Sequence, residues 1–461
     1  MKRTGEHSYW WSRCAARISF GILGLCVCSS SLARSYSLLP EESSVGIDAA
    51  GYFHSSSQAS ESFRAQVFPQ VVGVFDEQGK WRFLEWGARA DLMMLMTGVT
   101  EGRVRPVPLI DVPEIFLTTP RGVSAVQFKV GRKLEHWSRL DEAWDLGIWQ
   151  PRYRWDYLHP EKEGLLGASF GFESTQFQAL LWASPFFVPE RGAPINNQEG
   201  RMDSDSRWFV PPPHSIPLFG QSTSVNYHLN LPPLGELMSH SGWSAQLRWG
   251  KRGLGPWMTL SGADKPLNQL LLSSDAYLKI SETQGVFADA SIYPRVGWHR
   301  LAGGEAGWVA RQWDAWISAH REWPRQEALR LDWTVQQVVP ATAIASQVAW
   351  NSAGGSRIEL DYFQVSGGNA GDLGPLAGGG DESMYEARYP YRSAWSITEK
   401  NSIDGERFSN WSRLFFDPKH RVSVLSTEIK YHAGKRWQWG RHAPVAPPGQ
   451  RSFGSRPARR L

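Results

Sequence analysis

Cysteine is scarce in this sequence, and all three residues, Cys14, Cys26 and Cys28, lie close to the N-terminus. A chain that begins after them can form neither a disulfide framework nor a cysteine-ligated metal site. Long apolar runs are also missing. Beyond the N-terminal region, no stretch resembles the roughly 20 apolar residues of a transmembrane helix. The rest of the chain is therefore either soluble or crosses a membrane as strands.

Motifs of common enzymes and metal sites are likewise lacking. We identify no Gly-x-Ser-x-Gly elbow, no His-Glu-x-x-His pair and no glycine-rich phosphate loop. The twelve histidines are scattered, and His299, His320 and His432 lie on or near the ends of candidate strands. We interpret these three as interfacial or lumen polar residues. We predict that the protein is not an enzyme and needs neither a cofactor nor a metal.

The N-terminus has the layout of a signal peptide. Lys2 and Arg3 precede an apolar stretch at 18–27, which is about half the length of a membrane-spanning helix. Small residues follow at Ser31 and Ala33, the two positions that a signal peptidase reads. We predict cleavage after Ala33, and therefore export.

The formal net charge of +4 comes from the two ends of the chain. Residues 1–33 and 441–461 together hold nine basic residues and one acidic residue, so the body at 34–440 carries a net charge of −4. Strong basicity would favour nucleic-acid binding. The body shows none, and we predict no nucleic-acid partner.

A period of two runs through most of the chain and predicts β-strands with one apolar and one polar face. The clearest cases are Trp243, Ala245, Leu247 and Trp249, which alternate with Ser244, Gln246 and Arg248, and Leu329, Leu331, Trp333 and Val335, which alternate with Arg330, Asp332, Thr334 and Gln336. Similar patterns occur at 84–94, 124–132, 286–299, 307–320, 358–365, 388–397 and 422–431. Turn residues separate them, as at Gly303-Gly304 and Asp404-Gly405.

Many of these segments have about nine to twelve residues, the length that a tilted strand needs to cross a bilayer. Several of the 24 tryptophans lie near turns, as expected of aromatic girdles at the lipid headgroups. We predict an all-β protein, an antiparallel transmembrane β-barrel of about sixteen strands, within a range of 14–18, with long loops on one rim. The alternative is a soluble antiparallel sheet with one wet face.

Four parts follow from these patterns: a signal peptide at 1–33, a Ser-rich periplasmic arm at 34–62, the barrel at 63–440 and a disordered basic tail at 441–461. Within the barrel, long connections lie at 133–164, 189–220 and 367–383. Loops this long usually belong to the outer rim of a barrel or fold into its lumen.

One short stretch resembles porin-like and alginate-export-like barrels. It runs from Val130-Gly131-Arg132-Lys133 through Trp137, Asp141, Trp144 and Gly147. In those families a Gly-Arg pair ends a strand before a loop that contains Asp and Gly. The resemblance covers about twenty residues and implies a lumen or extracellular loop built around Arg132 and Asp141, and a passive channel. The Trp-rich loop at 137–155 also offers aromatic faces on which sugars can stack.

We therefore predict a channel in the bacterial outer membrane for small solutes or saccharides. The residues expected to line its lumen are Glu85, Arg89, Asp91, Gln127, Lys129, Arg248, Arg330, Asp332, Glu359 and Asp361, and the candidate loop residues are Arg132, Trp137, Asp141 and Trp144. Their mixed signs predict weak ion selectivity. The alternative is a plugged barrel with a structural, assembly or polysaccharide-export role, in which the loops or the basic tail dock a protein partner.

Overall fold

A computed structural model describes most of the chain between residues 42 and 439. The described residues are 42–54, 64–81, 84–100, 103–120, 125–154, 160–192, 195–204, 212–218, 220–250, 255–281, 285–325, 332–352, 354–368, 372–373, 388–389, 391–403, 408–418, 422–432 and 438–439. The predicted signal peptide and basic tail lie outside them.

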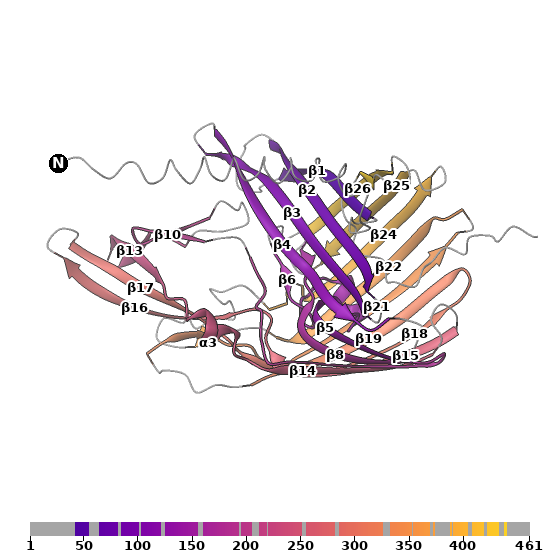
Figure 1. Cartoon of the computed structure of the whole chain (residues 1–461). Helices are drawn as coiled ribbons and strands as arrows, with labels where there is room; N and C mark the ends of the chain where they lie inside the picture. Colours follow the sequence, from indigo (N-terminus) through magenta and orange to yellow (C-terminus); the bar gives the residue numbers. More distant parts are fainter. Residues whose placement is uncertain are drawn as a thin grey trace, which may run out of the picture.

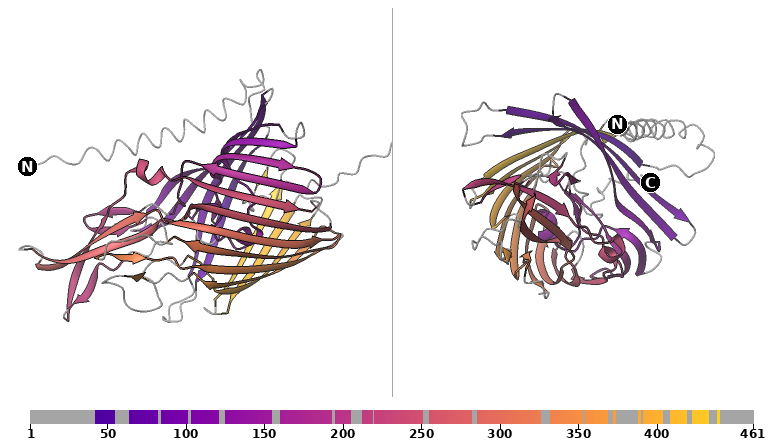
Figure 2. Two further views of the ribbon diagram at one scale, coloured as in Figure 1. Left: turned by 90° about the horizontal axis from the view of Figure 1, so that it is seen from below. Right: turned by 90° about the vertical axis from the view of Figure 1, so that its left-hand side faces the viewer.

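Antiparallel strands that are neighbours in the main sheet curl into a barrel (Figures 1 and 2). In order around the sheet they are β1 (Glu42–His54), β2 (Arg64–Trp81), β3 (Leu84–Thr100), β4 (Arg103–Thr118), β5 (Val126–Lys133), β8 (Leu165–Glu173), β9 (Phe177–Ser184), β14 (Gly242–Trp249), β15 (Gly255–Pro266), β18 (Trp298–Val309), β19 (Trp313–Pro324), β21 (Ala341–Asn351), β22 (Arg357–Gly367), β24 (Ser393–Ile403), β25 (Phe408–Asp417), β26 (Val422–His432) and β27 (Gln438–Trp439). The short strand β27 lies beside β1, which brings the two ends of the sheet together.

The all-β antiparallel prediction is confirmed, whereas the count of sixteen is not. The main sheet contains seventeen strands among the described residues, and the last has only two residues. The first strand was also missed. Glu42–His54 falls in the stretch assigned to an N-terminal arm, yet it pairs along its whole length with β2. Val45, Ile47 and Phe53 do alternate with small and polar residues there, but the Ser-rich composition of the surrounding stretch led to its assignment as an arm.

The apolar faces of these strands are exposed and their polar faces are buried, the opposite of the arrangement in a soluble protein. On β14, Trp243, Leu247 and Trp249 are exposed while Ser244 is fully buried. On β5, Phe128 is exposed and Lys129 is buried. The period of two read from the sequence is therefore confirmed on these strands, with the apolar side chains on the outside of the barrel and the polar ones inside.

Long connections gather at one rim, as predicted. They follow β5, β9, β15, β19 and β22, and each leads to a neighbouring strand of the barrel. The connections at the opposite rim are short turns, such as those at 174–176, 310–312 and 352–356. Because consecutive strands are antiparallel, this strict alternation gives the barrel one rim of loops, here called the loop rim, and one of turns, the turn rim.

A second sheet of six strands projects from the loop rim (Figure 1). It consists of β12 (Ser215–Leu218), β13 (Gln221–Leu229), β17 (Gly285–Arg295), β16 (Leu271–Ser281), β20 (Thr334–Gln336) and β23 (Asp372–Leu373), and β13 and β17 pair in parallel. Smaller elements in the same connections are β6 (Arg152–Tyr153), β7 (Glu161–Lys162), β10 (Asn196–Gln198), β11 (Arg201–Asp203) and the helices α2 (Arg139–Ala143) and α3 (Leu234–Met238). No helix of the described residues is long and apolar enough to cross a membrane.

Two segments that the sequence assigned to the barrel belong to this second sheet. Most of 286–299 forms β17, and 334–336 forms β20, in which Val335 is buried instead of facing lipid. Trp333 is half-buried and stacks on Tyr293, with ring centroids 4.5 Å apart. Leu329 and Leu331 lie outside the described residues. A one-sided sheet in water gives the same alternation as a membrane strand, so the period alone could not separate the two.

Candidate functional site

Most of the polar and charged residues predicted to line the lumen lie on inward faces of the barrel. Buried there are Arg89, Asp91, Lys129, Glu359 and Asp361, and half-buried on the same faces are Glu85, Gln127 and Arg248. Asp332 is different, because it is an exposed turn residue that accepts a hydrogen bond from Tyr277 in the second sheet. The lumen assignment of Asp332 was wrong for the same reason as that of β20. Arg330 lies outside the described residues.

The inward charges are matched locally with partners. Arg89 donates to Asp91, with Nη2 and Oδ2 3.0 Å apart. Asp361 accepts hydrogen bonds from Gln347 Nε2 (2.7 Å) and Ser396 Oγ (2.8 Å). Gln347 and Ser396 are neutral, so they satisfy the carboxylate of Asp361 without cancelling its charge. The paired charges of Arg89 and Asp91, by contrast, leave little net field between them.

The long connection after β5 enters the lumen. Its first part, residues 134–154, is called the plug here. Six of its apolar side chains are almost fully buried: Trp137, Leu140, Trp144, Leu146, Ile148 and Trp149. A surface loop would leave these side chains in water, whereas here they form one core with inward residues of the barrel wall.

Aromatic contacts fix the plug against the wall. Trp137 and Trp149 stack within the plug, with ring centroids 6.0 Å apart and planes 8° apart. Trp144 packs on Phe363 of β22 (5.3 Å) and on Phe415 of β25 (6.2 Å). Because the three plug tryptophans are buried in these contacts, the predicted sugar-stacking surface is not available on them.

A carboxylate on β18 anchors the start of the plug. Glu305 Oε1 accepts hydrogen bonds from Ser138 Oγ (3.0 Å), from the backbone N–H of Arg139 (2.7 Å) and from Ser318 Oγ of β19 (2.9 Å). Two of these three donors belong to the plug. Glu305 therefore couples the barrel wall to the first turn of α2.

Asp141 joins the two ends of the turn within the plug by hydrogen bonds. Its carboxylate accepts from the backbone N–H groups of Ile148 (2.9 Å) and Trp149 (3.1 Å), and its own N–H donates to Ser138 Oγ. Burial raises the pKa of Asp141, and the two backbone hydrogen bonds partly offset that rise. The prediction of a loop built around Asp141 thus agrees with the structure, and its role there is to hold the turn of the plug.

Arg132 acts at the base of the connection and not at its tip. It donates to Glu163 Oε2 (2.7 Å) and to the backbone oxygens of Val112 (2.9 Å) and Gly164 (3.1 Å). Glu163 also pairs with Arg191. Arg132 therefore ties the end of β5 to the start of β8, where the connection leaves and rejoins the wall.

A second polar cluster inside the barrel was not found from the sequence. Glu322 of β19 accepts hydrogen bonds from Arg388 Nη2 (3.0 Å) and Tyr389 Oη (2.8 Å), and it contacts His299 Nδ1 of β18. Glu322 and Arg388 are 66 residues apart, and no local pattern relates them. This cluster holds the connection between β22 and β24 inside the loop rim.

His299 and His320 are buried polar residues within the barrel, as interpreted, and the side chain of His432 lies outside the described part of the structure.

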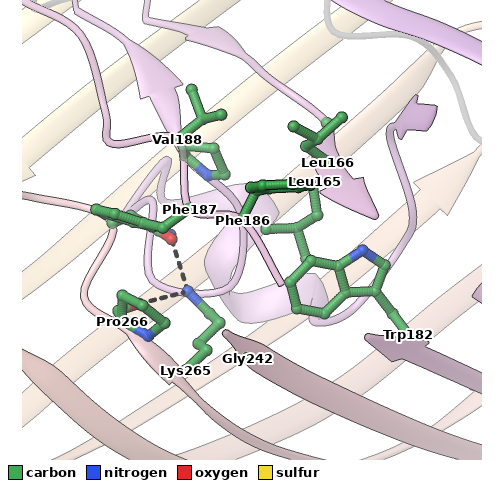
Figure 3. Close-up of a pocket in the computed structure, with 12 residues that line it drawn as sticks. Leu165, Leu166, Trp182, Phe186, Phe187, Val188, Gly242, Lys265 and Pro266 are labelled. Carbon is green, nitrogen blue, oxygen red and sulfur yellow. Dashed lines mark hydrogen bonds between the residues drawn. The ribbon is translucent and has the colours of Figure 1, made fainter. Parts of the chain in front are cut away.

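A small cavity lies where the plug meets β15 (Figure 3). Lys265 points into it and donates to Asn268 Oδ1 (2.6 Å), and Asn268 Nδ2 donates to the plug backbone at Gly147 O (2.7 Å) and Ile148 O (3.1 Å). The cavity has a volume of about 20 Å³, enough for about one water molecule. It is too small to be a solute path.

Two features of the described residues bear on catalytic and metal chemistry. The sequence does contain one Gly-x-Ser-x-Gly stretch, from Gly167 to Gly171, but it lies within β8, and not on the strand-to-helix turn that exposes a nucleophilic serine. Within the described ranges, no group of three or more His, Cys, Asp or Glu side chains is placed to hold a metal ion.

Comparison with known proteins gives structural likeness without sequence relatives. The sequence matches no known family and no curated protein. Solved structures with a similar arrangement include OmpF of Salmonella typhi (10% identity, covering 84% of this chain and 95% of that one, TM-score 0.41), a variant of the Rh. blastica porin (6%, 84% and 99%, 0.38) and OmpT, an outer membrane protein of Vibrio cholerae (7%, 87% and 95%, 0.37). At these identities no residue role carries over to this chain.

Proposed function

We propose that this protein is an outer-membrane β-barrel channel for small polar solutes, with a lumen narrowed by the plug. The proposal rests on the distribution of side chains in the barrel wall, which is apolar on the outside and charged on the inside. Exposed apolar side chains occur on one strand after another, among them Phe128, Leu247, Leu260, Ile317 and Leu360. Exposed apolar side chains on so many neighbouring strands are unfavourable in water and suit a hydrocarbon environment.

Two belts of exposed tryptophan support the same placement. Trp308, Trp313 and Trp350 lie at the turn rim, and Trp323 and Trp395 lie at the loop rim. Trp313 and Trp323 are ten residues apart on β19. At about 3.4 Å per residue and a tilt of about 40°, they are separated by roughly 26 Å along the barrel axis. Outer-membrane barrels have an apolar band about 25 Å tall between aromatic girdles.

The interior supports passage of small polar solutes with weak charge preference. Inward charges of both signs lie close together, as with Arg89 and Asp91 or with Glu359 between Arg357 and Lys400. The plug packs against a large part of the wall, so that large solutes are excluded. We expect small conductance steps and a reversal potential near zero in a salt gradient.

A second candidate is a barrel that the plug closes completely and that serves a structural or assembly role. The near-complete burial of Trp137, Leu140 and Trp149 favours it, since tightly packed side chains leave no room for water between them. The two candidates differ in whether the native protein conducts.

Single-channel recording in planar bilayers tests both. The variant Glu305→Ala removes the anchor that joins the plug to β18. Loss of its charge-assisted hydrogen bonds should favour plug release by about 2 kcal/mol, which is roughly a thirtyfold change in the ratio of released to packed plug. Glu399→Ala is the matched control, because Glu399 is exposed on the outward face of β24.

Steps from the native protein, with larger or more frequent openings in Glu305→Ala and unchanged behaviour in Glu399→Ala, support the channel. Steps in Glu305→Ala alone support the closed barrel. If neither folded protein conducts, the channel proposal fails.

A further inference from the structure

Three arginines gather on the outside of the barrel at the loop rim. Arg300 lies near the start of β18, Arg321 lies near the end of β19, and Arg325 follows the last residue of that strand. All three belong to the outward side: Arg300 and Arg325 have side chains 66% and 46% exposed, and Arg321 is exposed too. Outward positions of β18 and β19 further along the barrel are apolar, as at Ile317.

The cluster carries an excess of positive charge. Arg300 and Arg325 share one carboxylate, that of Asp264 on β15, with closest approaches of 3.3 Å and 2.6 Å. Arg321 lies 5.3 Å from the ring centroid of Trp323, and no described carboxylate pairs with it. Three guanidinium groups and one carboxylate leave a net charge of about +2 on this small area.

Aromatic rings place the arginines at the depth of lipid headgroups. Arg325 lies 5.1 Å from the ring centroid of Trp298, and its backbone N–H donates to Trp298 O. Trp298 and Trp323 lie at the loop-rim belt of the barrel, where amphipathic indole rings favour the boundary between hydrocarbon and headgroups. Guanidinium groups beside such a belt face the headgroups, and not the hydrocarbon.

We propose that Arg300, Arg321 and Arg325 form a binding site for the phosphate groups of a lipid in the outer leaflet. Arg300 is directly opposite Trp323, two residues from Arg321, so Arg300 and Arg321 are diagonal neighbours with Cα atoms about 7–8 Å apart. Their long side chains can converge on one phosphate or hold two adjacent ones, and guanidinium forks match phosphate oxygens in pairs. The acyl chains would then lie against the apolar outer face of β18 and β19.

This site rests on the proposed membrane placement, and its test is separated from that of the channel. We would refold the full chain in detergent and titrate it with lipid A that carries two phosphates, and with the same lipid without phosphate, and measure binding by native mass spectrometry. The test variant is Arg300→Ala with Arg321→Ala. The matched control is Arg311→Ala, because Arg311 is exposed in the short turn at the opposite end of the same β18–β19 hairpin. Insertion of all proteins into phosphatidylcholine vesicles is measured in parallel.

We expect lipid A with phosphates to bind at least about tenfold more tightly than the lipid without them, and the double variant to lose this preference while Arg311→Ala keeps it. Basic side chains near an anionic lipid surface each strengthen binding several-fold, so that the loss of two of them is enough to remove a tenfold preference. The proposal is overturned if the two lipids bind equally, if Arg311→Ala weakens binding as much as the double variant, or if inorganic pyrophosphate alone competes fully at the concentration of the lipid. Failure to enter vesicles would reject the membrane placement itself.

Discussion

Arginine placed at two depths on one strand should have two different costs. Ala315 and Ala319 both face outward on β19, between Trp313 and Trp323. Counted from Trp313 at about 3.4 Å per residue and a tilt of about 40°, Ala315 lies about 5 Å inside the belt and Ala319 about 16 Å inside it. The middle of the apolar band is about 13 Å from either belt. Ala319 is therefore close to the midplane, and Ala315 is close to the headgroups.

Arg at the midplane of a membrane barrel costs roughly 2 to 4 kcal/mol, and near the interface roughly 0 to 1 kcal/mol. We expect Ala319→Arg to reduce the free energy of unfolding by about 2 kcal/mol more than Ala315→Arg does. The parent and both variants would be refolded into bilayers and unfolded with denaturant while tryptophan fluorescence is recorded. The substitution is the same in both variants, so that side-chain size does not explain a difference. Equal costs would refute the depth assignment, and a parent that stays folded and monodisperse in plain buffer would refute the membrane barrel.

Two further outcomes follow from the interior and from the second sheet. Phe363→Ala removes a fully buried contact between the wall and the plug, and we expect it to destabilise the protein by about 3 to 5 kcal/mol in denaturant unfolding. The control Leu360→Ala, on the outward face of the same strand, should cost much less. Similar losses in the two variants would mean that the plug is not packed against β22. Partial burial alone would raise the pKa of Asp289, but hydrogen bonds from Lys279 and His228 lower it, so this carboxylate should stabilise β17 at neutral pH and lose that effect as the pH falls through its lowered pKa. The hydrogen-exchange protection factors of β16 and β17, which correct for the slower intrinsic exchange in acid, should fall on acidification in the parent, and a variant Asp289→Asn whose protection factors fall equally would contradict this.

The wall of the barrel was predictable on strands such as β14 and β5, which have polar side chains on the inside and apolar ones on the outside. On β14 the contrast between Leu247 and Ser244 appears directly as a period of two in the sequence, and burial follows it. The same rule located Lys129 and Asp361 inside. It failed at Val335, where a strand of the second sheet repeats the alternation with its apolar side buried against protein.

The contents of the lumen could not be predicted in the same way. Trp144 and Phe363 are more than two hundred residues apart, and their contact depends on how the sheet closes and not on any local period. The plug could be recognised only as a long connection dense in tryptophan, with no sign of which faces it buries. Glu322 and Arg388 show the same limit, since complementary charges far apart in the sequence carry no information about pairing.

The most direct test of the membrane barrel is a cysteine scan along β19. A chain that begins after residue 33 has no cysteine, so that single cysteines at positions 313 to 323 can each be labelled with a polarity-sensitive fluorophore in bilayers. We expect lipid exposure at Ala315, Ile317 and Ala319, protection at Trp316, Ser318 and His320, and the deepest signals midway between Trp313 and Trp323. Exposure to water at every position, or a profile without a period of two, would contradict a strand that crosses the membrane with one face to lipid and the other to a filled lumen.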